Sequence, residues 1–153
     1  MSIPFAKRKA LAVSERLTAT GSLTDDTLII AADTVVATEG EILGKPRDGD
    51  DAFRMLSSIS GREHRVITGV SLIYGGVQTS DFCATTVRVA EIPESEIRKY
   101  VASGDPLDKA GAYGIQGEFS KWIMGIEGCY FNVVGLPTHT LNKLFFKVTG
   151  EYI

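Results

Sequence analysis

Apolar residues recur at two different spacings along the chain, and these spacings predict two kinds of element. A spacing of about three to four residues places apolar side chains on one side of a helix, whereas continuous β-branched runs are typical of strands. The helical spacing occupies four segments, at about residues 2–19, 48–60, 93–103 and 137–147. The strand-like runs cover about residues 27–36, 64–74 and 77–90. The order of elements therefore predicts an α/β fold.

Residues with strong local preferences mark several boundaries of these elements. Ser2 is expected to cap the first helix, and Asp48 or Asp50 to cap the second. Gly61 is suited to end the second helix, because glycine readily adopts the left-handed conformation found there. Gly75-Gly76 separates the two longest strand-like runs and predicts a hairpin between them.

The remaining segments are less regular. Residues 27–36, TLIIAADTVV, form a nearly continuous apolar run and are expected to be a strand buried on both faces. A polar turn follows, and Ile42-Leu43 is expected to return as a short strand. Residues 105–135 are rich in glycine and aromatic side chains, which predicts loops and short strands.

Composition and charge exclude several classes of protein. A length of 153 residues suits one domain with a core. The net charge of −3 argues against a nucleic acid polymer as partner. Apolar runs are too short for a membrane span, the N-terminus does not resemble a signal peptide, and the two cysteines are far apart. We therefore expect a cytoplasmic protein that does not bind a membrane, with neither a zinc site nor a disulfide.

Asp33 is the most informative residue for chemistry, because it interrupts an apolar strand. A buried carboxylate is costly unless it is paired or bound to a cation. Two interpretations follow from its position, and both stay open here. Asp33 is either a hydrogen-bonded residue where the strand ends, or a functional carboxylate of the kind found at such strand ends.

Lysine and amide side chains offer partners for an anionic ligand. Lys45 lies between Gly44 and Pro46, so its backbone is stiff, and a hairpin after Asp33 would bring it back toward that residue. Gln116 lies in the glycine-rich stretch and offers a donor and an acceptor, as reading a nucleobase edge requires. Taken alone, Lys45 and Gln116 favour interpretation as ordinary surface residues, and Lys9 of the first helix can equally be a solvated lysine.

The two histidines, by contrast, are isolated in the sequence. We interpret His64 as a strand residue with a local hydrogen bond and His139 as a residue on a helix surface. No Walker-type phosphate loop is found in the sequence.

Several segments taken together resemble the Maf family of nucleotide pyrophosphatases, and they cover nearly the whole chain. The matching segments are AKRKA (6–10), AADTVV (31–36), GEILGKPRD (40–48), MLSSISGREHRVITGV (55–70), EIRKYVASGDPLDKAGAYGIQG (96–117) and IEGCYFNVVGLP (126–137). The resemblance implies an α/β fold of the Maf and inosine triphosphatase type. In this fold an elongated mixed central sheet is surrounded by helices, and two lobes flank a cleft.

The resemblance also implies an activity and a set of site residues. It implies hydrolysis of a nucleoside triphosphate, with dTTP or UTP favoured, to the monophosphate and pyrophosphate, as house-cleaning of nucleotide pools. Asp33 matches the general base and a ligand of a divalent cation, Mg²⁺ or Mn²⁺. Lys9 and Lys45 match phosphate-facing lysines, and Thr34 and Gln116 match positions tied to base choice.

One departure from the family motivates alternatives. Members usually begin with a strand and an SxSPRR loop, so residues 1–153 are expected to form a single Maf-like domain that is N-terminally truncated. A second hypothesis is therefore a catalytically impaired nucleotide-binding protein with a regulatory role in cell division. A third is an interaction module. The edge of the long hairpin could pair with a second copy, which makes a homodimer an expectation.

Overall fold

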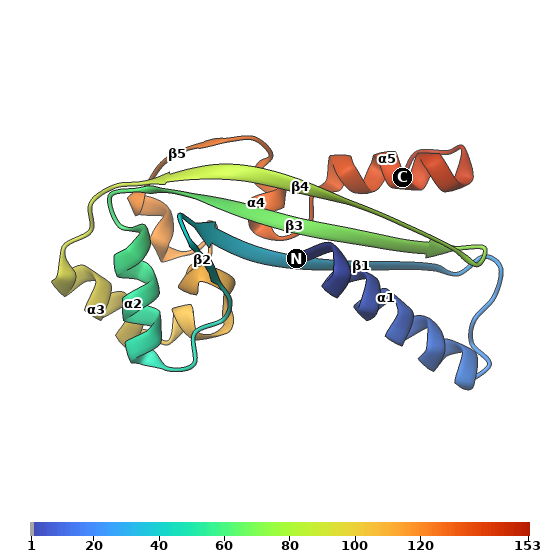
Figure 1. The fold of residues 1–153 in the computed structure, drawn as a ribbon, viewed down its shortest axis with the longest axis horizontal. Coiled ribbons are helices and arrows are strands. Elements are labelled where there is room, and N and C mark those ends of the chain that lie inside the picture. Colours follow the sequence, from blue (N-terminus) through green and yellow to red (C-terminus); the bar gives the residue numbers. More distant parts are fainter. Residues whose placement is uncertain (1) are drawn as a thin grey trace. The chain divides into compact units, whose positions relative to one another are not determined.

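The computed structural model describes residues 2–153, and its centre is a five-stranded sheet. The strands are β1 (Leu28–Thr38), β2 (Glu41–Leu43), β3 (Glu63–Tyr74), β4 (Val77–Val89) and β5 (Ile123–Glu127). They lie in the order β2-β1-β3-β4-β5, and neighbours run antiparallel (Figure 1). The predicted α/β class with a central sheet is thus confirmed, although the strands are antiparallel where a mixed sheet was expected.

Helices precede, interrupt and follow these strands. The α-helices are α1 (Ser2–Ala19), α2 (Gly49–Ile59), α3 (Glu94–Ala102), α4 (Tyr130–Val134) and α5 (Thr138–Thr149). Three short 3₁₀ turns follow α3, at η1 (Asp105–Asp108), η2 (Ala110–Ala112) and η3 (Glu118–Trp122). The helices predicted from apolar spacing are confirmed, whereas α4 lies in a segment that was expected to contain only loops and short strands. Within residues 2–153, no helix combines the length and apolar character that a membrane crossing requires.

Local signals placed most boundaries correctly. Asp48 is the N-cap of α2, where its Oδ1 accepts a hydrogen bond of 2.8 Å from the backbone N–H of Asp51. Gly75 and Gly76 have φ angles of 57° and 78°, as a tight hairpin turn with both central residues left-handed requires. Ser2 is already the first residue of α1 and is buried, so its predicted role as the cap is not confirmed.

Contacts along the chain cluster in two compact units. Unit 1 comprises Met1–Thr34, Thr68–Cys83 and Gly135–Ile153, and unit 2 comprises Val35–Ile67 and Ala84–Val134. Strands β1, β3 and β4 contribute residues to both units. The expectation of one domain over residues 1–153 stays a prediction.

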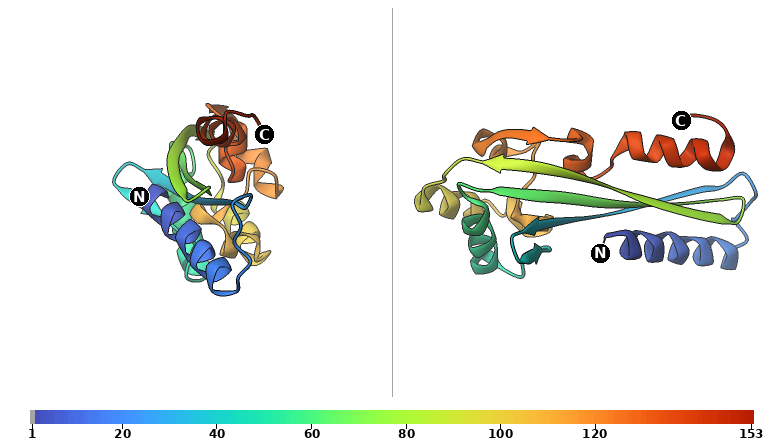
Figure 2. Two further views of the ribbon diagram at one scale, coloured as in Figure 1. Left: turned by 90° about the vertical axis from the view of Figure 1, so that its right-hand side faces the viewer. Right: turned by 45° about the horizontal axis from the view of Figure 1, so that its top comes forward.

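Unit 1 is layered, with α1 and α5 on opposite faces of its strands (Figure 2). Ala10 of α1 packs against Ile29 and Ile73, whereas Leu141 and Leu144 of α5 pack against Val70 and Leu72. This alternation follows from the strand geometry, in which successive side chains point to opposite faces.

The helices cover only part of β1. Within this strand Ile29 and Val36 are buried, but Ile30 is exposed and the other residues are intermediate. The expectation that residues 27–36 form a strand buried on both faces was therefore wrong.

A glycine of β3 sets how closely α1 approaches the sheet. A Cβ atom on Gly69 would lie 2.5 Å from the carbonyl carbon of Ser2 and 2.6 Å from the backbone nitrogen of Ile3. Any side chain at position 69 would therefore push the first turn of α1 away from the strand. The contact fixes the start of the helix that carries Lys9.

The core of unit 2 surrounds α2. This helix contributes Ala52, Met55, Leu56 and Ile59, the apolar stripe that predicted it, and all four are buried. They pack with buried residues of β3, β4 and α3 and with Tyr113 and Phe119 of the glycine-rich segment. The segment that carries Gln116 is thus held by aromatic side chains in the core.

Candidate functional site

Asp33 of β1 is paired with Lys9 of α1 in unit 1. Lys9 Nζ donates hydrogen bonds to Asp33 Oδ1 at 2.6 Å and to the carbonyl oxygen of Ala32 at 3.2 Å. The Asp33 side chain is 19% exposed and that of Lys9 is 55% exposed. The ion pair explains how a largely covered carboxylate is tolerated in β1, and the exposed lysine leaves a side from which a ligand can reach it.

Thr34 points to the opposite face of β1, because side chains alternate along a strand. Its Oγ1 lies 2.9 Å from Oγ1 of Thr68, a fully buried residue of β3. A Cβ atom built on Gly135 would come within 3.8 Å of the same Thr34 oxygen. The Thr34 hydroxyl is therefore engaged on a different face from the Asp33 carboxylate.

Lys45 lies in unit 2, in the exposed loop between β2 and α2. The hairpin that precedes it is confirmed, since Val36 pairs with Leu43 and Thr38 with Glu41. The carbonyl oxygen of Gly44 accepts a hydrogen bond of 3.0 Å from the backbone N–H of Gly111. This bond joins the loop of Lys45 to the glycine-rich segment that carries Gln116.

The glycine-rich segment has an unusual backbone. Gly111 has a φ of 72°, and a Cβ atom there would lie 2.7 Å from the side chain of Val36. Ala112 has a φ of 66°, the one positive value at a non-glycine position among residues 2–153. Such conformations persist only where the surroundings enforce them, and they concentrate at functional sites. Gln116 follows on an exposed turn.

Tyr113 anchors this segment to β3. Its hydroxyl and Nε2 of His64 share a hydrogen bond of 2.6 Å, and its ring lies 4.6 Å from that of Phe119. Burial lowers the pKa of His64 from its usual 6.5 to about 4, so the imidazole is neutral at pH 7. The predicted local hydrogen bond of His64 was wrong, because its partner is distant in sequence. His139 is exposed on α5, as expected.

Lys109 is occupied by neighbouring carboxylates. Its Nζ donates to the carbonyl oxygen of Asp105 at 2.8 Å, to Asp105 Oδ1 at 2.9 Å and to Asp108 Oδ1 at 2.9 Å. The hydroxyl of Tyr100 donates to Asp105 Oδ2 at 2.6 Å, and this bond, followed by that from Lys109, lowers the pKa of Asp105. Lys109 therefore bonds to η1, the turn with which the glycine-rich segment begins.

The carboxylates of the described chain are not arranged to hold a permanently bound metal ion by themselves. Across residues 2–153, no group of three or more His, Cys, Asp or Glu side chains is arranged to hold a metal ion. Asp33 offers a single carboxylate. Mg²⁺ commonly takes one or two carboxylates and completes its shell with substrate phosphates and water. Asp33 therefore fits a cation that binds together with a polyphosphate.

The sequence analysis did not single out Asp51, Arg54 or Tyr113, which lie beside the loops of Lys45 and Gln116. Asp51 and Arg54 of α2 form an ion pair of 3.0 Å beside the Lys45 loop. Their spacing of three positions on one helix face is a recognised pairing signal and could have revealed them. Tyr113 could not be found in this way, because its partner His64 lies on a distant strand.

Comparison with known proteins identifies the family. The family model described as Maf-like protein matches residues 2–148. A dTTP/UTP pyrophosphatase of Clostridium perfringens (strain ATCC 13124) is 47% identical over 143 residues, which cover 92% of this chain and 70% of that protein.

Two further relatives carry the same name. A dTTP/UTP pyrophosphatase of Clostridium botulinum (strain Okra) is 43% identical over 94% of this chain and 73% of its own length. One of Koribacter versatilis (strain Ellin345) is 53% identical over 71% of this chain and 56% of its own length. The extent of the match and these identities show that the chain belongs to the Maf family.

Proposed function

We propose that this protein hydrolyses a nucleoside triphosphate, dTTP or UTP, to the nucleoside monophosphate and pyrophosphate. Membership of the Maf family, together with relatives named dTTP/UTP pyrophosphatase, supports this activity. The observation that carries the proposal is the Asp33 carboxylate, which is largely covered, lies on β1 and is paired with Lys9. The activity would remove nucleotides from cytoplasmic pools.

In the proposed reaction, Asp33 accepts a proton from the attacking water. The water oxygen forms a bond to the α-phosphorus, and the bond from that phosphorus to the oxygen bridging the α- and β-phosphates breaks. The bridging oxygen leaves with pyrophosphate. A carboxylate is a weak base for free water; a divalent cation held by Asp33 and the triphosphate would lower the pKa of the water and so make this base adequate. Mg²⁺ and Mn²⁺ are the proposed cations, with Asp33 as their protein ligand.

The proposed binding residues divide into two groups by chemistry. Lys9 and Lys45 offset the charge of the phosphates, because an ammonium is a compact charge with several donors. Gln116 and Thr34 contribute to base choice. For Gln116, the proposal rests on its exposure and on its amide, which can donate and accept. For Thr34, it rests on the match of the AADT segment, residues 31–34, to the Maf family, in which this position is tied to base choice.

We further propose a homodimer. The pairing of β4 with β5 is confined to Thr86–Val89, so most of β4 lies outside this pairing. In the proposed dimer, the hairpin edge of a second copy would pair along this remaining part of β4. Light scattering on the eluate of a sizing column tests the proposal, which predicts twice the mass of the 16.5 kDa chain.

The decisive experiment measures the products. The purified protein, supplied with Mg²⁺ and dTTP or UTP, should release pyrophosphate and not orthophosphate. Asp33→Asn should reduce kcat by at least about a hundredfold, the usual contribution of a general base. Asp26→Asn removes an exposed carboxylate from the same unit and serves as the matched control. Nucleotide binding without turnover by the unaltered protein would instead support a binding role.

A further inference from the structure

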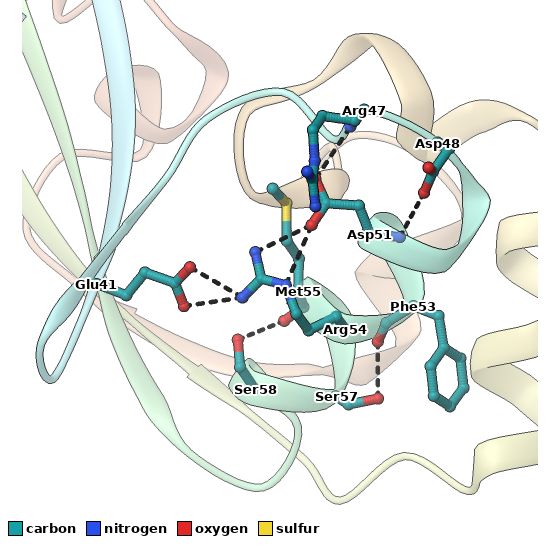
Figure 3. A network of polar contacts seen from close by, with 9 residues as sticks. All are labelled: Glu41, Arg47, Asp48, Asp51, Phe53, Arg54, Met55, Ser57 and Ser58. Carbon is teal, nitrogen blue, oxygen red and sulfur yellow. Dashed lines mark hydrogen bonds and ion pairs between the residues drawn. The ribbon is translucent and has the colours of Figure 1, made fainter.

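The chain is attached on both sides of Lys45 to a pair of residues of α2. Before Lys45, Glu41 of β2 bonds to Arg54, and after Lys45, Arg47 bonds to Asp51. Asp51 and Arg54 are themselves paired (Figure 3). All of these residues belong to unit 2.

The attachment after Lys45 uses the buried carboxylate of Asp51. Asp51 Oδ2 accepts a hydrogen bond of 3.0 Å from the backbone N–H of Arg47 and another of 3.4 Å from Arg47 Nε. The Asp51 side chain is 5% exposed, whereas that of Arg47 is 83% exposed. The pKa of Asp51 is lowered, and the main cause is the hydrogen bond that its carboxylate accepts from the backbone N–H of Arg47. The carboxylate therefore holds the main chain two residues after Lys45.

The attachment before the loop uses the guanidinium of Arg54. Its Nη1 donates to both carboxylate oxygens of Glu41 at 2.9 Å, while Nε and Nη2 donate to Asp51 Oδ1 at 3.1 and 3.0 Å. Figure 3 shows this guanidinium between the two carboxylates. A planar guanidinium with several donors suits such a bridge, and a lysine would not reproduce its geometry.

Helix capping accounts for only part of the Asp51 contacts. An acidic third residue of a helix that accepts from the backbone before the N-cap resembles a capping box, whereas the pairing of Asp51 with Arg54 is not part of a cap. Asp48 already caps α2 by accepting from the Asp51 backbone N–H. A buried carboxylate needs compensation, which here comes from Arg54 and from the backbone beside Lys45. The bonds of the Asp51 side chain thus connect the main chain beside Lys45 to Arg54, which in turn bonds to Glu41.

We propose that the Asp51–Arg54 pair is the positioning device of the Lys45 loop and thereby sets the affinity for the triphosphate. The inference rests on the phosphate-binding role proposed for Lys45. Holding the chain on both sides of Lys45 lowers the conformational entropy that binding would otherwise cost. Asp51 and Arg54 are positioning residues that act through Lys45.

A double-mutant cycle tests this inference. Asp51→Asn should raise the KM for dTTP about tenfold with little change in kcat, as expected for the loss of charge-assisted hydrogen bonds that order a binding loop. Lys45→Ala should also raise KM. In the double variant the effect of Asp51→Asn should disappear, because residues that act through one contact are not additive. Asp50→Asn, an exposed neighbour on α2, should leave KM unchanged.

The outcomes separate this inference from the proposed function. If Lys45→Ala raises KM while Asp51→Asn does not, or if the two effects add, the positioning role is overturned and the enzymatic proposal stands. If the unaltered protein releases no pyrophosphate, the proposed function fails first. A merely structural Asp51 would lower the melting temperature and leave KM of the folded protein unchanged.

Glu41→Gln provides a second route if Asp51→Asn does not fold. The Glu41 side chain is 45% exposed, so its substitution removes only the bridge before the loop. It should raise KM for dTTP by a smaller factor, about twofold to threefold, because the pair is partly exposed to solvent. Exchange of the backbone amides of Gly44, Lys45 and Arg47 should be faster in this variant. Unchanged exchange together with an unchanged KM would overturn the inference.

Discussion

The ammonium of Lys9 lies 2.6 Å from the carboxylate of Asp33, so the proposed general base is ion-paired in the free protein. A cation that binds Asp33 must therefore replace or share this partner. Lys9→Met should strengthen the binding of Mn²⁺ in the absence of nucleotide by about threefold, a modest factor because the lysine is partly exposed. The same variant should raise the KM for dTTP, since the charge proposed to contact the phosphates is lost.

Titration with Mn²⁺ followed by electron paramagnetic resonance measures the first effect, and steady-state kinetics measure the second. Lys7→Met changes an exposed lysine of the same helix and is the control. Weaker Mn²⁺ binding in Lys9→Met would contradict the role of Asp33 as the cation ligand.

The Thr34–Thr68 hydrogen bond allows stability and base choice to be separated. Thr34→Val and Thr68→Val each remove one hydroxyl from the bond of 2.9 Å, and each should lower the free energy of unfolding by about 1 kcal/mol. Only Thr34→Val should change the ratio of kcat/KM between dTTP and a purine nucleotide. Urea denaturation and competition assays measure the two quantities. An equal change of this ratio in both variants would assign Thr34 an indirect role.

Gly69 should tolerate no side chain, because a Cβ atom there would meet the backbone of Ser2 and Ile3 at less than 3 Å. Gly69→Ala should reduce the free energy of unfolding by about 3 kcal/mol, at the upper end for overpacking, since backbone atoms cannot move aside easily. Chemical denaturation measures the loss. Gly44→Ala is the control, as nothing lies within 4 Å of its added Cβ. Equal stability of the two variants would show that α1 can shift without cost.

His64 should make the protein less stable in acid. Its pKa is lowered from 6.5 to about 4, so the unfolded chain binds a proton in this interval and the folded protein does not. The stabilisation is present above pH 6.5 and is lost as the pH falls through about 4, amounting to about 3 kcal/mol.

Denaturation of the unaltered protein and of His64→Gln between pH 7 and pH 4 tests this. The variant should show a flatter dependence of unfolding free energy on pH, whereas His139→Gln, at an exposed position, should not. Parallel curves for His64→Gln and the unaltered protein would assign the acid sensitivity to other groups.

Most elements could be predicted from the sequence because their signals are local. The Gly75-Gly76 turn and the Asp48 cap depend on the residues around them, and both were confirmed. Helix α4 was missed because its placement depends on distant partners. Asn132 in α4 is buried and donates to the carbonyl oxygen of Val66 and to Thr85 Oγ1, each at 3.0 Å. A short helix held by such bonds has no periodicity to reveal it.

For the candidate site, the residue types could be predicted from the sequence, but their contacts could not. The Asp33 carboxylate could be singled out because it interrupts an apolar strand, but its pairing with Lys9 depends on how α1 packs on the sheet. The bond between Thr34 and Thr68 needs the neighbouring order of β1 and β3, which the order along the chain does not specify. The contacts could not be predicted because they join residues that are distant in the sequence, although the types of these residues were informative.

The hydrogen bond from the Gly111 N–H to the Gly44 carbonyl joins the two loops that carry Lys45 and Gln116. It uses main-chain atoms only, so side-chain replacements at positions 45 and 116 leave it intact. With the roles proposed above for Gln116 and Lys45, substitutions at position 116 can change the accepted nucleobase during evolution while the phosphate contact of Lys45 is kept. On this proposal, base choice and phosphate binding can diverge independently of each other in related proteins.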